Sequence, residues 1–223
     1  MEVTIKNFLG GVIMKIAVVA AAGKAGRKIV KELKTRGFEV TAFVRKQAEI
    51  DGADKVIIKD IFNLTKQDLE GFNAVVDAFG AWTPETLSQH STTLKHLCDC
   101  LSGTNVRLLV VGGAGSLFVN KEHTMMVMDT PDFPEMFKPL AKAQGSALQE
   151  LRERKDVKWT FISPAGDFQA DGERTGKYIL GGEELVLNGK NESIISYADY
   201  AIAMADEIEK GNHIQQRISV VRE

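Results

Sequence analysis

The amino-acid sequence predicts an α/β fold with a doubly wound parallel sheet and helices on both of its faces. Six short apolar runs rich in β-branched residues alternate with longer stretches of helical spacing, which is the pattern of βαβ units. The chain has 223 residues, enough for one domain with a large buried core. We therefore expect a single domain over residues 14–223 and an N-terminal extension of unknown role over residues 1–13.

The expected elements follow one another in a regular order. Strands are expected at residues 16–21, 40–44, 56–58, 74–79, 106–111 and 157–162. The first helix covers residues 24–36, with Gly37 as its C-cap. Further helices are expected over residues 84–101, opened by a proline, and from about 134 to 154, where Pro139 should bend the helix or delay its start.

The texture of the sequence changes after the sixth strand. Residues 163–182 are rich in glycine and charge and lack a helical period, so we expect a long functional loop there. Short strands at 184–187 and 193–196, a helix over 197–210 and a closing strand at 217–221 complete the prediction.

Composition excludes several classes of partner. The 28 basic and 30 acidic residues nearly cancel, so no overall field would hold the protein on nucleic acid or an anionic membrane. Cys98 and Cys100 point in different directions on a predicted helix and cannot pair with each other. Without a cysteine framework, an apolar run near 18 residues or a signal peptide, we expect a cytoplasmic protein whose oligomeric state stays open.

The first strand runs directly into a small-residue loop, residues 20–26, after which helical spacing begins. This is the setting of a dinucleotide-binding fingerprint, which needs a tight turn, a close approach of backbone to pyrophosphate and a helix N-terminus. Gly23 and Gly26 can meet the last two needs, but Ala20 replaces the usual first glycine. If the turn requires a positive φ, Ala20 carries strain of about 1 kcal/mol or more. The expected cofactor contacts in this loop are Ala20, Ala22, Gly23, Lys24, Ala25 and Gly26.

The end of the second strand bears on the choice of cofactor. An NAD site would carry an acid about 20 residues past the loop, to bond the ribose 2′-hydroxyl. Here Arg45 and Lys46 occupy that place, and Arg45 can bind a 2′-phosphate with its fork of N–H groups. We expect NADP(H) as the preferred cofactor and NAD(H) as the other candidate. The alternative is that both side chains only solvate a strand end.

Two further strand ends are expected to contact the nucleotide. Asp60 and Ile61 follow the third strand, where such folds commonly contact the adenine, although Asp60 could equally cap a helix or turn. Ala78, Phe79 and Gly80 end the fourth strand and should lie beside the adenine ribose and the pyrophosphate.

Four more stretches complete a family resemblance: GGAGSL at 112–117, WTFISP at 159–164, RTG at 174–176 and ISYADY at 195–200. With them the chain resembles the atypical short-chain dehydrogenase/reductases, in particular the NAD(P)H-binding group provisionally labelled NADH-flavin reductases. The resemblance covers nearly everything from Met14 onward. It implies a Rossmann-like sheet with a small C-terminal substrate-side lobe, and reduction of a flavin, quinone or similar planar acceptor by a pyridine nucleotide. It also implies cofactor contacts at Gly112, Gly113 and Pro164.

One feature common in the wider superfamily is missing. Carbonyl chemistry there uses a tyrosine acid with a lysine four residues later, and none of Tyr178, Tyr197 and Tyr200 has that lysine. Reduction of an electron-poor flavin or quinone needs few catalytic side chains, because the acceptor can take protons from water. Ser116 is the best candidate for a polar contact to the nicotinamide or the acceptor, although it could be an ordinary turn serine.

Three hypotheses remain on the sequence alone. The first is a reductase of a planar aromatic acceptor, and the second is a non-catalytic sensor of the NADP(H) pool that uses the same pocket. The third is a small-carbonyl reductase or epimerase-like enzyme with an unrecognised acid. A metal site is not expected, because the four histidines are scattered and the two cysteines lie on one helix. The sequence also lacks the Gly-x-Ser-x-Gly elbow of a hydrolase.

Overall fold

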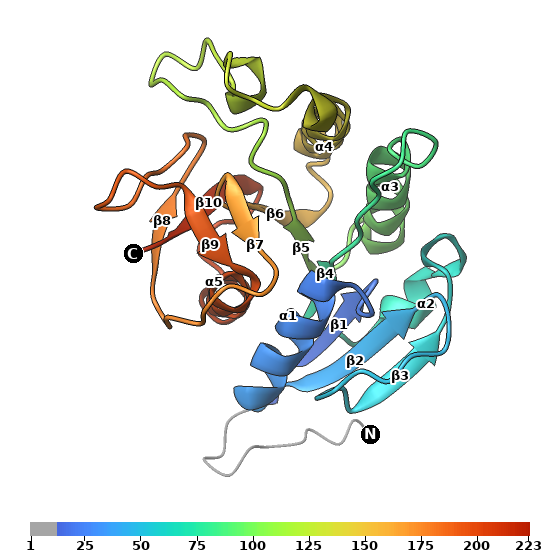
Figure 1. Cartoon of the computed structure of the whole chain (residues 1–223). Helices are drawn as coiled ribbons and strands as arrows, with labels where there is room; N and C mark the ends of the chain where they lie inside the picture. Colours follow the sequence, from blue (N-terminus) through green and yellow to red (C-terminus); the bar gives the residue numbers. More distant parts are fainter. Residues whose placement is uncertain (1–12) are drawn as a thin grey trace.

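The computed structural model describes residues 13–223, and in these residues it has a main sheet of eight strands (Figure 1). The strand order is β3-β2-β1-β4-β5-β6-β10-β8. The chain therefore builds the sheet outward from β1 to β3 and then returns to build the other half from β4, which makes the sheet doubly wound. The predicted fold class is confirmed. Residues 1–12 of the predicted N-terminal extension lie outside the described residues.

Each of the six predicted parallel strands is present, within two residues of its predicted bounds. They are β1 (Lys15–Val19), β2 (Glu39–Val44), β3 (Lys55–Ile58), β4 (Ala74–Asp77), β5 (Arg107–Val111) and β6 (Lys158–Ser163). The closing strand β10 (Gln216–Arg222) pairs in parallel with β6, and β8 (Tyr178–Gly181) pairs antiparallel with β10. Because β1 to β6 run in parallel, their carboxyl ends meet at one edge of the sheet, and the loops that follow them lie there together.

The long helices agree with the helical spacing of the sequence. They are α1 (Lys24–Thr35), α3 (Gln89–Leu101), α4 (Lys138–Arg152) and α5 (Tyr197–Lys210), with a short α2 (Lys66–Leu69) and 3-10 turns η1 (Ile61–Asn63), η2 (Val127–Asp129) and η3 (Glu135–Phe137). Gly37 ends α1 as predicted: its φ is 84°, its N–H donates to the carbonyl of Lys34 and the N–H of Phe38 donates to that of Leu33. Pro139 lies in the first turn of α4 and therefore delays the helix instead of bending it.

Helices cover both faces of the sheet, and alternate residues of β1 point to opposite faces (Figure 1). Ile16 and Val18 belong to a buried cluster that includes residues of α1 and α5. Ala17 and Val19 belong to a second cluster, formed with α3 and α4. This two-sided burial explains why β1 is a continuous apolar run and does not alternate with polar residues.

Three predictions about local structure are wrong. α3 begins at Gln89 and not at residue 84, because residues 83–88 fold into turns held by main-chain bonds from Thr86 and Leu87 to Thr83. The predicted loop at 163–182 contains β7 (Asp167–Gln169) and β8. The predicted strand at 184–187 is absent, and Glu184 makes only an isolated bridge to Phe118.

The two missed strands, β7 and β8, share a physical reason. β7 pairs with β9 (Ile194–Ser196) in a separate two-stranded sheet, and β8 pairs with β10, so each depends on a partner far along the chain. Local sequence patterns carry little information about such pairings. The two-stranded sheet and its loops form the small C-terminal lobe that the family resemblance implies. Among the described residues, no helix is both long and apolar enough to span a bilayer.

Candidate functional site

The predicted cofactor residues come from distant parts of the chain and lie on the loops that follow β1 to β6. They are Ala20, Ala22, Gly23, Lys24, Ala25 and Gly26 after β1, Arg45 and Lys46 after β2, Asp60 and Ile61 after β3, Ala78, Phe79 and Gly80 after β4, Gly112 and Gly113 after β5, and Pro164 after β6. The parallel strands therefore bring all of these segments to one edge of the sheet. Ligands of doubly wound sheets bind in the crevice along this edge.

The chain leaves β1 through a tight turn at Ala20. Its φ is 57°, a left-handed conformation that L-residues adopt at a cost of about 1 kcal/mol. The N–H of Gly23 donates to the carbonyl of Ala20 at 3.1 Å, which closes the turn. The sequence analysis expected strain at Ala20 if the turn required a positive φ. The fold has this positive φ, so the strain is present.

The two glycines of the loop have different physical roles. A Cβ on Gly26 would lie 2.8 Å from Cα of Ala21 and 2.9 Å from its carbonyl oxygen, so the fold itself requires glycine where α1 passes the strand end. A Cβ on Gly23 would meet only the Ala20 carbonyl oxygen, at an ordinary 3.4 Å. The protein packing therefore leaves the space over Gly23 open.

The N-terminus of α1 presents unpaired donors at this open space. Gly23 is the N-cap and has no side chain to accept a hydrogen bond, so the N–H groups of Lys24, Ala25 and Gly26 have no intrahelical or side-chain acceptor within residues 13–223. Such N–H groups, together with the helix dipole, attract phosphate. Lys24 is exposed beside them. These residues fit a pyrophosphate.

Basic side chains near the loop divide into two kinds. Arg27 is occupied, because its guanidinium donates to the carbonyl of Ala22 at 3.0 Å and to that of Glu49 at 2.7 Å, and it braces the loop. Arg45 and Lys46 are exposed after β2 and make no ion pair among residues 13–223. They keep positive charge available at the place where a ribose 2′-substituent is expected.

The loops after β3 and β4 are held by local hydrogen bonds. The Asp60 carboxylate accepts from the N–H of Phe62 at 2.9 Å, so Asp60 caps η1, as the alternative interpretation of the sequence proposed. The N–H of Ala78 donates to the carbonyl of Val19 at 3.1 Å, and the N–H of Phe79 donates to the Asp77 carboxylate at 3.0 Å. These bonds fix the backbone at the edge next to the β1 loop.

The loops after β5 and β6 are closely packed. A Cβ on Gly112 would overlap the ring of Phe161, and one on Gly113 would overlap the side-chain amide of Gln144 on α4. Ser163, at the end of β6, is fully buried, and its hydroxyl has no hydrogen-bond partner among the described residues. Ser163 was not among the predicted site residues, although it belongs to the WTFISP stretch and comes immediately before Pro164.

Ser116 is buried, and its oxygen atoms are engaged by an arginine from β10. Nη1 of Arg217 donates to the Ser116 hydroxyl and to its carbonyl, both at 2.9 Å. Arg217 also forms an ion pair with Glu183 at 2.7 Å, and Arg152 pairs with the same carboxylate at 2.7 Å. Burial lowers the pKa of Arg217. No local sequence pattern predicts this cluster, because Arg217 lies 101 residues from Ser116.

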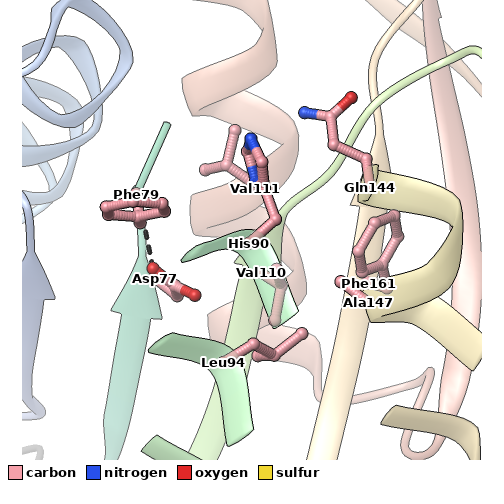
Figure 2. A pocket seen from close by; sticks show the side chains of 9 residues that line it. All are labelled: Asp77, Phe79, His90, Leu94, Val110, Val111, Gln144, Ala147 and Phe161. Carbon is pink, nitrogen blue, oxygen red and sulfur yellow. Dashed lines mark hydrogen bonds between the residues drawn. The ribbon is translucent and has the colours of Figure 1, made fainter. Parts of the chain in front are cut away.

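A narrow hollow with polar side chains opens beside the predicted nucleotide residues (Figure 2). It lies between α3 and α4 at the ends of β4 and β5, and Asp77, His90 and Gln144 are its polar lining. Asp77 is only 4% exposed, and burial raises the pKa of its carboxyl to about 6. Burial lowers the pKa of His90, whose Nε2 lies 3.1 Å from the carbonyl of Ala81. Sequence reasoning considered His90 only as a metal ligand and missed Asp77 and Gln144.

The RTG and ISYADY stretches meet in the C-terminal lobe. The fully buried Asp199 carboxylate accepts from the N–H and hydroxyl of Thr175, at 3.1 and 2.8 Å, and from the N–H of Gly176 at 2.9 Å. Ser196 caps α5 by accepting from the N–H of Asp199 at 3.0 Å. We call these four residues the Asp199 clasp; it ties the loop before β8 to the start of α5.

The tyrosines serve packing and hydrogen bonding within the protein. Tyr200 is fully buried and donates to the carbonyl of Ile162 at 2.7 Å, and Tyr178 donates to Asp206 at 2.8 Å. Burial raises the pKa of both phenols. The ring of Tyr197 packs against that of Phe168, with the two ring centroids 4.0 Å apart. In residues 13–223 no group of three acidic, histidine or cysteine side chains is placed to hold a metal ion.

Known proteins are similar to this chain in sequence, and solved structures are similar to it in architecture. The uncharacterized protein YwnB of Bacillus subtilis is 47% identical over 212 residues, which cover 94% of this chain and 99% of that protein. A crystal structure of a Streptococcus pneumoniae protein, provisionally named an NADH-flavin reductase, has a TM-score of 0.92 and 55% identity, covering 94% of this chain and 100% of that one. A shorter stretch of 86 residues is 31% identical to 3-diazoavenalumate denitrifying reductase of a Streptomyces species, covering 39% of this chain and 26% of that protein.

Residues 20–209 match the family described as NAD(P)H-binding. The match begins at Ala20, where the β1 loop turns toward α1, and ends within α5, so it includes every predicted cofactor contact. The resemblance stated from the sequence motifs is confirmed, and the chain belongs to the NAD(P)H-binding family of Rossmann-type proteins.

Proposed function

We propose that this protein is an NAD(P)H-dependent reductase that transfers hydride to a flavin, a quinone or a similar planar acceptor in the cytoplasm. The observation that carries the proposal is the open space over Gly23, in a chain of the NAD(P)H-binding family. N–H groups of α1 that have no partner in the described part of the chain face this space. The name of the Streptococcus pneumoniae neighbour supports a flavin as the acceptor.

Different loops at the carboxyl edge of the sheet bind different parts of the cofactor. The N–H groups of residues 24–26 hold the pyrophosphate, and Arg45 and Lys46 hold a ribose 2′-phosphate, which makes NADPH the preferred cofactor. Asp60 and Ile61 border the adenine, and residues 78–80 border the ribose and the pyrophosphate. Gly112, Gly113 and Pro164 border the nicotinamide. When bound, the cofactor supplies the hydride.

The site that binds the acceptor needs an aromatic side chain for stacking more than it needs several proton-donating side chains. Trp82, in the loop after β4, is 69% exposed and lies next to Gly80, so its ring is free to stack on a planar molecule. Ser116 accepts its hydrogen bond from Arg217, so its own hydroxyl proton remains free to donate to the nicotinamide or the acceptor. No Tyr-x-x-x-Lys pair is required for such an acceptor.

The test is consumption of NADPH by the purified protein, without oxygen, on adding free flavin or a soluble quinone. We expect the absorbance of NADPH to fall only when protein and acceptor are both present. Ser116→Ala should slow turnover by about tenfold, which corresponds to the loss of one hydrogen bond in the transition state, with NADPH affinity unchanged. Cofactor that binds but is never oxidised by any acceptor would overturn the reductase and favour a sensor of the NADP(H) pool.

A further inference from the structure

The loops that border the proposed nicotinamide and acceptor sites carry a strong excess of acidic residues. These acceptor loops follow β4, β5 and β6 and cover residues 78–88, 112–137 and 164–177. They contain three basic residues and eight acidic ones: Glu85, Glu122, Asp129, Asp132, Glu135, Asp167, Asp171 and Glu173. Within residues 13–223 only Glu135 among these acids makes an ion pair, with Lys138 at the start of α4. The other seven acids give this end of the edge a negative potential.

The basic residues of the acceptor loops do little to offset this charge. Arg174 pairs with a glutamate of α1 at 2.9 Å, and Lys177 pairs with Glu223 at 3.5 Å. Lys121 is exposed and is followed directly by the exposed Glu122. The acceptor loops, all within the described residues, therefore offer a phosphate group no arginine that lacks an acidic partner.

The other end of the same edge has the opposite charge balance. Residues 20–27 after β1 and residues 45–54 after β2 contain four basic and three acidic residues. Two of these acids, Asp51 and Asp54, are paired with lysines of α1. Charge is therefore separated along the edge. Its positive end is where the phosphates of the cofactor are proposed to bind, and its negative end is where the acceptor is proposed to bind.

The acceptor loops also expose large apolar side chains. Met136 is 77% exposed and Trp82 is 69% exposed, which makes them the two most exposed large apolar residues in the described part of the chain. Phe137 is exposed as well. Trp82 precedes α3, and the other two precede α4. Because α3 packs against α4, these loops lie at the same end of one helix pair (Figure 1). Apolar surface of this kind suits a ligand with little charge.

The segment between β5 and α4 lies beside Ser116. The N–H of Met128 donates to the carbonyl of Gly115 at 2.9 Å, and a Cβ on Gly115 would lie 3.7 Å from the ring of Phe133. A Cβ on Gly145 would lie 3.4 Å from Cβ of Ser116 and 3.9 Å from Cε of Met128. This acidic and apolar segment is therefore next to the proposed polar contact of the acceptor.

We propose that the acceptor is an uncharged planar molecule such as a quinone, and that the acidic loops exclude flavin nucleotides. This inference rests on the proposed reductase function and names the chemical class of its acceptor. The fold and the family indicate the site, and the charges select among the planar molecules that could enter it. A phosphate dianion is repelled by a surface of like charge, which slows its association. An uncharged ring meets no such repulsion and gains by covering Trp82 and Met136.

The reaction balances with a quinone. A hydride carries two electrons and one proton from the nicotinamide, which is oxidised, to the quinone, which is reduced. A second proton, taken from water, completes the quinol.

The first test compares two flavins that share one ring system. Riboflavin is uncharged, and FMN differs from it by one phosphate. With saturating NADPH, no oxygen and low ionic strength, we expect kcat/KM for riboflavin to exceed that for FMN by about tenfold. At about 0.5 M salt the ratio should approach one, because salt screens the repulsion between exposed charges. Taking the ratio at each salt concentration cancels the effect of salt on NADPH.

The second test compares two naphthoquinones. Menadione is uncharged, and 1,4-naphthoquinone-2-sulfonate is an anion. The sulfonate group withdraws electrons and makes its quinone the stronger oxidant, so chemical reactivity alone predicts that the sulfonate reacts faster. We expect the opposite order, with kcat/KM about tenfold higher for menadione at low ionic strength.

A third test measures acceptor binding without turnover. The chain has two tryptophans, and Trp159 is only 2% exposed, so an acceptor that stacks on Trp82 quenches mainly the emission of Trp82. With NADP⁺ in place of NADPH, menadione should quench at lower concentration than the sulfonate. Trp82→Phe, in which only Trp159 emits, corrects for light absorbed by the quinone.

A charge-reversal variant tests the acidic loops directly. Asp132 is exposed and makes no ion pair within residues 13–223. Asp132→Lys should raise kcat/KM for FMN about threefold at low ionic strength and leave riboflavin unchanged. Glu70→Lys is the matched control, because Glu70 is exposed between α2 and β4, near the amino end of that strand. It should change neither value.

The outcomes separate the inference from the proposed function. A kcat/KM for FMN that equals or exceeds that for riboflavin at low ionic strength would overturn the inference and leave the reductase intact. A preference for riboflavin that salt does not change would also overturn it, because shape and not charge would then exclude the nucleotide. Absence of turnover with all four acceptors would instead remove the proposed function and the inference with it.

Discussion

Polar groups differ between two regions of the molecule in whether they have hydrogen-bond partners. One region is the nucleotide corner, which we define as residues 20–26 with Arg45, and the other is the Asp199 clasp. In the corner, the N–H groups at the start of α1 and the Arg45 guanidinium have no partners among the described residues. In the clasp, one buried carboxylate accepts three hydrogen bonds and leaves its neighbours satisfied. Both regions carry family motifs, so a motif alone does not separate a binding role from a structural one. The partners of its polar atoms do.

The largest effect is expected where the polar groups are satisfied. Asp199→Ala removes the acceptor of three hydrogen bonds and leaves a small cavity in the lobe, so we expect a loss of about 3 kcal/mol in the free energy of unfolding. NADPH affinity should change little, because the clasp lies outside the corner. Urea denaturation and a binding titration on the same variant measure both quantities, and a large loss of affinity in the folded variant would place the clasp in the binding site.

The corner should show the reverse pattern. Gly23→Val places methyl groups in the space over the loop, which the fold leaves open, so we expect about 100-fold weaker NADPH binding with little loss of stability. Gly26→Ala is the matched control, because its Cβ overlaps Ala21 and should destabilise the fold by about 2 kcal/mol. Unchanged binding in Gly23→Val would remove the loop from the cofactor site.

The same contrast explains what the sequence could predict. The βαβ elements follow from periodicity, since each strand or helix carries its own apolar pattern and α1 ends at its own glycine, Gly37. The open loop was also predictable, because strand, glycines and helix are adjacent in the chain. Ser116 was placed correctly after β5, but its bond to Arg217 spans 101 residues and no local pattern encodes it.

The hollow was invisible for a similar reason. Asp77 is an ordinary strand end in the sequence, His90 and Gln144 belong to different helices, and only the packing of α3 against α4 brings them together. The sequence analysis missed β8 because its side chains are partly exposed and show no clear apolar pattern. β8 is a strand because it pairs with β10, which lies far along the chain. Elements that depend on distant partners set the limit of the sequence prediction.

Cofactor choice sharpens the comparison further. If Arg45 is kept free to bind a 2′-phosphate, Arg45→Ala should weaken NADPH binding by about tenfold to 30-fold, the effect of losing charge-assisted hydrogen bonds, and leave NADH binding unchanged. Lys31→Ala on α1, whose exposed side chain pairs only weakly with Asp51 at 3.5 Å, controls for the loss of a positive charge. Equal affinity of the wild type for NADH and NADPH would end the assignment to Arg45.

The smallest effect tests whether the corner is strained for function. Ala20 holds a φ of 57° where glycine would be unstrained, so Ala20→Gly should raise the free energy of unfolding by up to about 1 kcal/mol, less the greater chain entropy of glycine in the unfolded state. Replacing Asn191, at a φ of 61° in the loop before β9, with glycine is the control outside the corner, and asparagine tolerates this conformation, so little gain is expected. If Ala20→Gly is more stable but binds NADPH less tightly, the strained alanine holds the loop in the conformation that binds the cofactor. The strain at Ala20 then lowers stability but increases the affinity for NADPH.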